Sequence, residues 1–144
     1  MEDRYLFKAK RVDNGEWITG SLITCEDGTC KIATSCLEGK TDEPILVCAY
    51  DVDRDTICQC TGLKDKNGKL IWENDVVKFD VYYYEKLESS TISQIKWCND
   101  LCALSLVVND RGTRGTLGHL MDINKEIEAI GNIFDNSELL ESEE

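Results

Sequence analysis

The chain has 144 residues, of which 42% are hydrophobic and 31% charged, a length and composition sufficient to bury one core without disulfide support. Its formal net charge of −12 at pH 7 repels a nucleic-acid backbone at long range, so we expect no direct nucleic-acid binding. No apolar run reaches the roughly 18 residues of a membrane-spanning helix, and the charged start lacks the apolar stretch of a secretory signal, so we expect a cytoplasmic protein without membrane association.

Turn residues punctuate the first part of the chain at short intervals, which is typical of proteins built from β-hairpins. The segments between these turns predict five strands: Tyr5–Val12, Trp17–Thr24, Cys30–Ser35, Ile45–Val52 and Thr56–Leu63. Of these, Ile45–Val52 is an apolar run and predicts a buried strand. The pair Asn14-Gly15 favours a type I′ hairpin, because Asn and Gly both tolerate positive φ. Leu37–Pro44 is polar, contains the only proline and predicts a loop.

The second part of the chain opens with Asn67-Gly68, which predicts a two-residue hairpin loop with both residues at positive φ. Further strands are expected at Lys69–Trp72, Asp75–Tyr84, Thr91–Trp97, Cys102–Val108 and Glu128–Phe134. The intervening segments are expected to be a break at Glu85–Ser90, a mobile loop at Asp110–Gly118, helical turns at Leu120–Glu126 and a fraying acidic end at Asn136–Glu144.

The strand expected at Asp75–Tyr84 shows the clearest alternation, with Val77 and Phe79 on one face and Lys78 and Asp80 on the other. No segment has a long helical periodicity. We therefore predict a mainly β protein whose short antiparallel hairpins form a β-barrel-like or sandwich core with little helix. We expect a single domain over residues 1–136, with a possible subdivision near 85–90, followed by an acidic C-terminal tail over 137–144.

Eight cysteines are many for this length, and none of their spacings gives the paired Cys-x2-Cys knuckles of a structural zinc site. They are Cys25, Cys30, Cys36, Cys48, Cys58, Cys60, Cys98 and Cys102. In a cytoplasmic protein we expect reduced thiols and no bound metal. Cys58 and Cys60 are two apart, so on a strand they share one face, where they could seed a metal site or an oxidation-sensitive pair.

Two other patterns resemble functional sites but lack groups that those sites require. Asp51, Asp53 and Asp55 resemble the start of a calcium loop, but the sixth and twelfth positions are not Gly and Glu, so we expect a solvated acidic turn. His119 is the only histidine and could pair with a thiol, although the sequence suggests no third group to orient it. We therefore expect no catalytic residue, no cofactor and no enzymatic activity.

Two further segments could bind ligands. Gly112, Gly115 and Gly118 alternate with Arg111 and Arg114, a composition that can bind phosphate but without the strand-to-helix setting of a phosphate loop, so a flexible surface loop is expected. The run Tyr82, Tyr83 and Tyr84 lies between Lys78 and Lys86. We interpret these tyrosines first as packing residues, second as a protein interface and third as a platform for single-stranded nucleic acid.

Three stretches of the chain together resemble the YopX-like family of phage and prophage proteins. The first runs from Phe7 to Gly20, the second and most specific from Thr61 to Val77, and the third from Ile130 to Leu140. The family-motif residues, interpreted as structural, are Thr61, Gly62, Leu63, Asp65, Asn67, Gly68, Glu73, Asp75, Gly131 and Asn132. Two positions depart from the family pattern: Asn74 replaces a usual Gly, whose positive φ Asn also tolerates, and Ser137 replaces a usual Pro.

The resemblance implies a β-rich, phage-encoded protein that acts inside a bacterial host as a homo-oligomer, and it supplies no catalytic residues. We therefore expect a non-enzymatic oligomeric binding module with an unknown protein partner. One alternative is an acidic modulator that occupies the nucleic-acid-binding site of a host or phage protein, and a second is a cysteine-dependent metal protein or enzyme.

Overall fold

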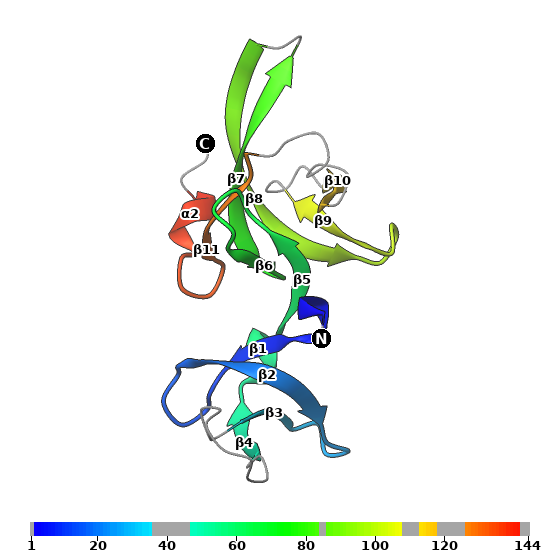
Figure 1. Cartoon of the computed structure of the whole chain (residues 1–144), viewed down its shortest axis with the longest axis vertical. Coiled ribbons are helices and arrows are strands. Elements are labelled where there is room, and N and C mark those ends of the chain that lie inside the picture. Colours follow the sequence, from blue (N-terminus) through cyan, green and yellow to red (C-terminus); the bar gives the residue numbers. More distant parts are fainter. Residues whose placement is uncertain (1, 36–46, 84–85, 108–112, 118–125, 142–144) are drawn as a thin grey trace. The chain divides into compact units, whose positions relative to one another are not determined.

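The computed structural model describes residues 2–35, 47–83, 86–107, 113–117 and 126–141. The chain is mainly β with little helix, as predicted, and its strands pair antiparallel in two sheets (Figure 1). Neither strand order returns to its first strand, so of the two predicted cores the sandwich-like one fits. The chain divides into two compact units, Met1–Cys60 and Thr61–Glu144.

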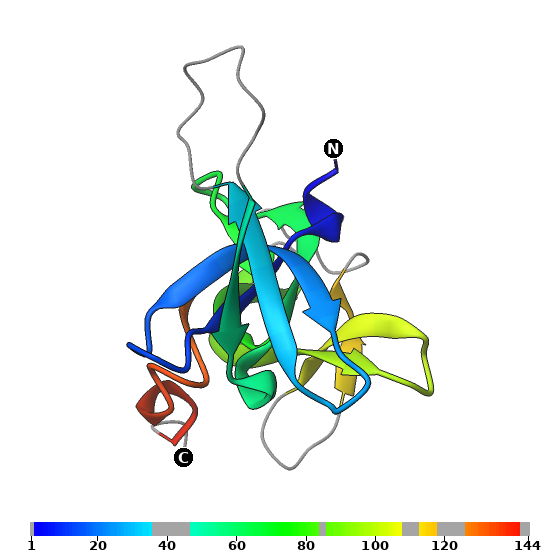
Figure 2. The same ribbon diagram turned by 90° about the horizontal axis from the view of Figure 1, so that it is seen from below.

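The first unit consists mainly of short strands, which can be followed in Figure 2. Its elements are η1 (Asp3–Tyr5), β1 (Phe7–Lys10), β2 (Trp17–Thr24), β3 (Cys30–Ser35), β4 (Val47–Val52), η2 (Arg54–Thr56) and the start of β5 (Cys58–Lys64). The strands pair in the order β4-β3-β2-β1-β5. The bounds of β2 and β3 are those predicted, because turn residues flank both strands.

One face of this sheet forms the core of the first unit. Ala9 and Ile32 are fully buried and Val52 nearly so, and half-buried apolar side chains pack around them: Phe7, Ile18, Leu22, Cys30 and Ile57. The register explains the set, because Ala9 lies opposite Ile18 and Ile32 lies opposite Leu22 on adjacent strands. Alternation along each strand therefore places one apolar row on a common face.

The end of β4 is also tied back to the end of β1. Val12 N donates to Asp51 O at 3.0 Å, Asp53 N donates to Lys10 O at 2.8 Å, and Arg11 and Val52 form an isolated antiparallel bridge. These bonds bring residues about 40 positions apart in the chain side by side. They hold the turn after β1 against the corner after β4.

The prediction that Ile45–Val52 is a buried strand is wrong for the part that the structure describes. Only Val52 is buried along β4, while Val47 keeps 65% of its surface exposed. The reason is position, since β4 lies at the edge of the sheet and alternates between a core face and an exposed face. Residues 45 and 46 and the predicted loop Leu37–Pro44 lie outside the described residues.

The second unit contains the end of β5 and the remaining elements. These are β6 (Leu70–Trp72), β7 (Asp75–Tyr83), β8 (Lys86–Cys98), β9 (Ala103–Val107), β10 (Thr113–Thr116), β11 (Glu128–Asn132) and α2 (Glu138–Glu141). β5 is the neighbour of β6, and the other strands form a sheet in the order β10-β9-β8-β7-β11. The predicted alternation of β7 is confirmed, with Val77 and Phe79 buried and Lys78 exposed between them.

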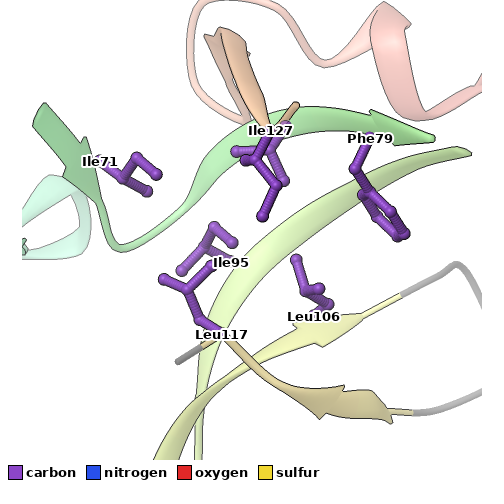
Figure 3. Close-up of a cluster of buried hydrophobic side chains, with 7 residues drawn as sticks. Ile71, Phe79, Ile95, Leu106, Leu117 and Ile127 are labelled. Atoms are coloured by element: carbon purple, nitrogen blue, oxygen red, sulfur yellow. The ribbon is translucent and has the colours of Figure 1, made fainter. Parts of the chain in front are cut away.

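The core of the second unit is larger than that of the first. Figure 3 shows side chains from separate strands converging on one cluster, which comprises Ile71, Val77, Phe79, Ile95, Leu106, Leu117 and Ile127. Each is at most 3% exposed, and Leu63, Leu104 and Ala129 pack against them. Burying an aliphatic or aromatic side chain of this size contributes about 1.5–3 kcal/mol. This cluster therefore dominates the stability of the second unit.

Two predictions for this unit are wrong. The expected break at Glu85–Ser90 is part of β8 from Lys86 onward, which pairs with β7 and has a register shift between Val81 and Tyr82. Polar residues suit a strand there because backbone hydrogen bonds, not side-chain burial, define the pairing. The expected loop at Asp110–Gly118 contains β10, which pairs with the edge of β9.

Other predictions differ only in their bounds or cannot be compared. The final strand ends at Asn132, not Phe134, and the predicted acidic tail contains α2. Most of the predicted helical turns at Leu120–Glu126 lie outside the described residues. The boundary between the two units follows Cys60, whereas the sequence suggested a subdivision near 85–90, where β7 and β8 instead pair with each other.

The predicted turn type at both Asn-Gly pairs is wrong. Gly68 has a φ of 81° and Gly15 a φ of 71°, while neither Asn67 nor Asn14 takes positive φ. Asp65 N donates to Lys69 O at 2.8 Å, so three residues form the loop rather than two. The Asp65 carboxylate accepts from the backbone N–H of Asn67 and of Lys69, which favours this longer turn.

Candidate functional site

An open groove of about 670 Å³ lies on the first unit where three of its connections meet. Three segments line it: the residues after β1, the β2–β3 turn and the corner between β4 and η2. The lining residues are Lys10, Arg11, Val12, Gly15, Gly28, Thr29, Cys30, Asp51, Val52, Asp53 and Arg54. Val12, Cys30 and Val52 give it apolar surface, and charged side chains of both signs surround them. This volume lies within the range of small-ligand sites.

Arg11 is the most constrained of the charged lining residues. Its guanidinium stacks at 4.2 Å from the centre of the Tyr50 ring, and Nη2 donates to Asp13 Oδ2 at 2.6 Å. Its Nε is buried and has no hydrogen-bond partner in the described part of the chain. An unsatisfied buried N–H destabilises the site by about 1–3 kcal/mol, so Arg11 is held at an energetic cost.

Most other charges of the groove are engaged within the protein. Asp51 accepts from Lys31 Nζ at 2.7 Å, and this hydrogen bond together with the charge of Asp51 raises the pKa of Lys31. Asp53 Oδ1 accepts from Asp55 N at 3.0 Å, and Lys10 Nζ lies 5.4 Å from the centre of the Trp17 ring.

Arg54 differs from these residues. Its side chain is exposed and makes no ion pair, hydrogen bond or ring contact within the described residues. Its Nη1 lies 3.5 Å from the place where a Cβ on Gly28 would stand, so the guanidinium extends towards the β2–β3 turn. Gly28 has a φ of 88°, which a side chain would strain, and it leaves this side of the groove open.

A second hollow of about 260 Å³ adjoins the groove and shares two lining residues with it. It is lined by Val12, Asp13, Ala49, Tyr50 and Asp51. Arg11 lines the groove and Tyr50 lines the second hollow, so the stacked pair contributes one side chain to each. Val12, which is 67% exposed, also faces both hollows.

The sequence-predicted motif residues lie elsewhere, in the second unit, and the most connected of them is Asp65. This carboxylate is 7% exposed. Oδ1 accepts from Asn67 N and Lys69 N, both at 2.9 Å, and Oδ2 accepts from Ala129 N at 3.0 Å. Burial alone would raise the pKa of Asp65, but the hydrogen bonds from Ala129, Lys69 and Asn67 outweigh it and lower the pKa. Asp65 thus attaches the β5–β6 turn to β11.

The other residues of the central motif also make backbone contacts. Thr61 Oγ1 donates to Ile71 O at 2.7 Å and accepts from Leu63 N at 3.1 Å, while Gly62 between them has a φ of 78°. Asp75 is 4% exposed and its Oδ2 accepts from Trp72 N at 2.9 Å across the turn that contains the half-buried Glu73.

Asn74, the departure from the family pattern, takes a φ of 67°. The expectation that Asn would preserve the turn is confirmed, because Asn74 N donates to Ile95 O at 2.7 Å and Asn74 O accepts from Ile133 N at 3.0 Å. This one residue therefore connects β8 to the turn that follows β11.

Gly131 and Asn132 organise the end of β11. Asn132 Oδ1 accepts from Phe134 N and Asp135 N, both at 2.9 Å, and Asn136 N donates to Asn132 O at 2.9 Å. A Cβ on Gly131 would lie 2.5 Å from Asn136 Oδ1, so a glycine is required for this turn to fold back on the strand. These residues close a turn and lie outside the groove.

The remaining chemical candidates do not form a site in the described residues. Asp51, Asp53 and Asp55 are exposed around η2, as the prediction of a solvated acidic turn requires. His119, Arg111, Gly112 and Gly118 lie outside the described residues. Gly115 and Arg114 belong to β10, and of the three tyrosines Tyr82 and Tyr83 belong to β7.

The cysteines correct one prediction. Cys48 is disulfide-bonded, so the expectation of reduced thiols is wrong there, while six others form no disulfide: Cys25, Cys30, Cys58, Cys60, Cys98 and Cys102. Cys58 and Cys60 are 1% and 2% exposed, which places both thiols in the interior. Among the described residues no group of three or more His, Cys, Asp or Glu side chains could hold a metal ion.

Of the lining residues, the sequence pointed to Asp51 and Asp53 only as members of an acidic turn and to Cys30 only as one of eight cysteines. The glycines Gly15 and Gly28 were visible as turn residues. The signal for a shared site was missing, because only the pairing of β1, β3 and β4 brings their ends together.

The chain is similar to a known protein family and to a solved structure. The family model described as YopX protein matches residues 6–141, which includes both units. The crystal structure of protein EF1440 from Enterococcus faecalis is similar in fold, with a TM-score of 0.56 and 21% sequence identity over 93% of this chain and 96% of that chain. No curated protein matches the chain. No helix among the described residues is long and apolar enough to span a membrane.

Proposed function

This chain belongs to the YopX protein family, and we propose that it is a non-enzymatic binding module whose binding site is the groove of the first unit. The observation that carries the proposal is the convergence of three connections on one open hollow of about 670 Å³. Its lining combines apolar surface with a few charged groups, which is the composition of ligand-binding sites.

The geometry of the groove supports binding because its walls are fixed before any ligand arrives. The hydrogen bonds between Val12 and Asp51 and between Asp53 and Lys10 hold two walls together, and Tyr50 and Asp13 fix the side chain of Arg11. A preorganised site loses less conformational freedom on binding, so more of the contact energy appears as affinity.

Membership of the family supports a proposal for the wider setting of this activity. We infer that the protein is encoded by a phage or prophage, acts in the cytoplasm of the bacterial host and assembles into a homo-oligomer that presents several grooves at once. Repeated grooves would raise the overall affinity for a partner that carries more than one binding segment.

The binding proposal can be tested by NMR with a short neutral peptide, N-acetyl-Ala-Leu-Ala amide, as a probe. We expect amide shifts that cluster at Val12, Gly15, Gly28 and Thr29 in a ¹⁵N-labelled sample of the full chain. Val12→Trp should abolish these shifts, because Val12 faces both hollows and its exposed position tolerates a larger side chain.

A matched control is Ile23→Trp, which introduces the same side chain at another exposed apolar position of the first unit, outside the groove lining. This variant should keep the shifts. Shifts scattered over both units, or shifts that survive Val12→Trp, would contradict the groove as the binding site.

A further inference from the structure

Among the lining cations of the groove, the side chain of Arg54 makes no ion pair or hydrogen bond with any residue that the structure describes. Arg11 donates to Asp13, Asp51 accepts from Lys31, and Asp53 accepts from a backbone N–H, so these groups are engaged within the chain. The Arg54 side chain has no such partner in the described residues and lies at the open side of the groove beside Gly28.

This arrangement indicates the charge of the ligand. On a chain with a net charge of −12, an exposed guanidinium without an acidic partner in the described residues can attract an anion to the groove. Arginine binds carboxylate and phosphate oxygens in a planar, two-point geometry that fits both groups. The Arg54 guanidinium therefore favours a ligand with an anionic end.

The surroundings of Arg54 distinguish between these two anions. Asp51, Asp53 and Asp55 lie within four residues of one another around it, and all three are exposed. Their repulsion grows with the charge of the ligand, so a carboxylate with one negative charge is favoured over a phosphate with almost two. The apolar surface of Val12, Cys30 and Val52 suits an apolar side chain attached to that carboxylate.

Resting on the proposed binding function, we propose that the groove recognises the carboxyl end of a polypeptide, with Arg54 pairing with the terminal carboxylate and the apolar floor receiving the side chain next to it. Arg54 is then the residue that distinguishes a free chain end from the interior of a chain. The occupant is a peptide with an apolar residue near its C-terminus.

The test compares two probes that differ at a single group, N-acetyl-Ala-Leu-Ala with a free carboxylate and the same peptide as the amide, with affinities measured by NMR titration of the full chain. We expect the acid to bind about fivefold more tightly, the scale of an exposed ion pair. Added salt should weaken binding of the acid and leave the amide unchanged.

Variants test whether Arg54 causes the preference for the acid over the amide. Arg54→Gln should remove the difference between acid and amide, and Arg54→Lys should restore part of it. Arg4→Gln, which removes an exposed arginine of the same unit outside the groove lining, should preserve it.

Equal binding of the two probes to the unmodified protein would overturn the carboxylate assignment and leave the groove as a neutral binding site. Binding of neither probe would overturn the proposed function itself. Inorganic phosphate displacing the acid at lower concentration than acetate does would also overturn the choice of carboxylate.

Discussion

At the scale of single residues, Asp65 illustrates how the family motif acts. A carboxylate at 7% exposure is unfavourable unless hydrogen bonds replace its water, and here three backbone N–H groups do so. Two of these donors lie in its own turn, and the third, Ala129, is 64 positions away. The residue therefore determines both the local turn and the attachment of that turn to β11.

We expect Asp65→Asn to lower the free energy of unfolding by about 2 kcal/mol, because the amide replaces one acceptor oxygen by a donor and leaves a backbone N–H unsatisfied. Urea unfolding measures this change. Asp55→Asn, an exposed carboxylate of the first unit, is the control and should change little. Equal stability of the two variants would show that the Asp65 carboxylate is dispensable.

The lowered pKa of Asp65 also predicts a pH dependence. Because its pKa in the folded protein lies below the ordinary value of 3.8, its stabilising contribution is complete above pH 3.8 and is lost as the pH falls through the folded value. Unfolding measured between pH 5 and pH 2 should therefore show a smaller loss of stability for Asp65→Asn than for the unmodified chain. Parallel curves would contradict this assignment.

The turn at Gly68 gives a second test at this scale. A Cβ at Gly68 meets nothing within 4 Å, so Gly68→Val costs only the strain of positive φ, about 1 kcal/mol of unfolding free energy or slightly more. Asn67→Val should cost less, since Asn67 does not take positive φ. Thermal unfolding of both variants checks this. Equal losses would instead support the two-residue turn that the sequence suggested.

At the scale of elements, β11 depends on the turn that follows it. Gly131→Ala brings a Cβ to 2.5 Å from Asn136 Oδ1, and we expect a loss of about 1–2 kcal/mol as the turn shifts. The double variant Gly131→Ala/Asn136→Ala removes the clashing atom, so its loss should be smaller than the sum of the two single losses. Simple additivity in urea unfolding would mean that the two side chains do not interact.

The bounds of an element were predictable from the sequence where turn residues flank the element on both sides. β2 and β3 have the expected bounds for this reason. β8 was predicted too short because Glu88, Ser89 and Ser90 resemble a loop in composition, while their pairing with β7 depends on a partner that local patterns do not reveal. The groove was not predictable at all, since its walls meet only after Arg11 pairs with Val52 across the sheet.

At the scale of the whole molecule, the exposed apolar side chains bear on assembly. Trp97 and Leu101 near the β8–β9 turn are 49% and 50% exposed, and Trp97 Nε1 donates to Asn99 Oδ1 at 2.8 Å, which fixes the ring. Large, rigid apolar side chains of this kind are typical of interface cores. They are the residues through which we expect copies of the chain to associate.

Light scattering at micromolar protein should therefore give a mass above that of one chain. Added salt should strengthen the assembly, because −12 per subunit opposes it at low salt. The double variant Trp97→Ser/Leu101→Ser should shift the mass towards one chain, while Val47→Ser, at an even more exposed apolar residue of the first unit, should not. A single-chain mass at low and moderate salt would leave a monomeric binding protein.

The third donor to Asp65 has a consequence for the order of events during synthesis. The first unit ends at Cys60, so it can fold once this residue has left the ribosome. The second unit must wait for β11, because this strand pairs with β7 and supplies the N–H of Ala129 to a carboxylate translated 64 residues earlier. During that interval the apolar surface that later surrounds Ile127 is open to other nascent chains. The excess of acidic residues in the chain then protects the protein against aggregation at the moment when it is most vulnerable.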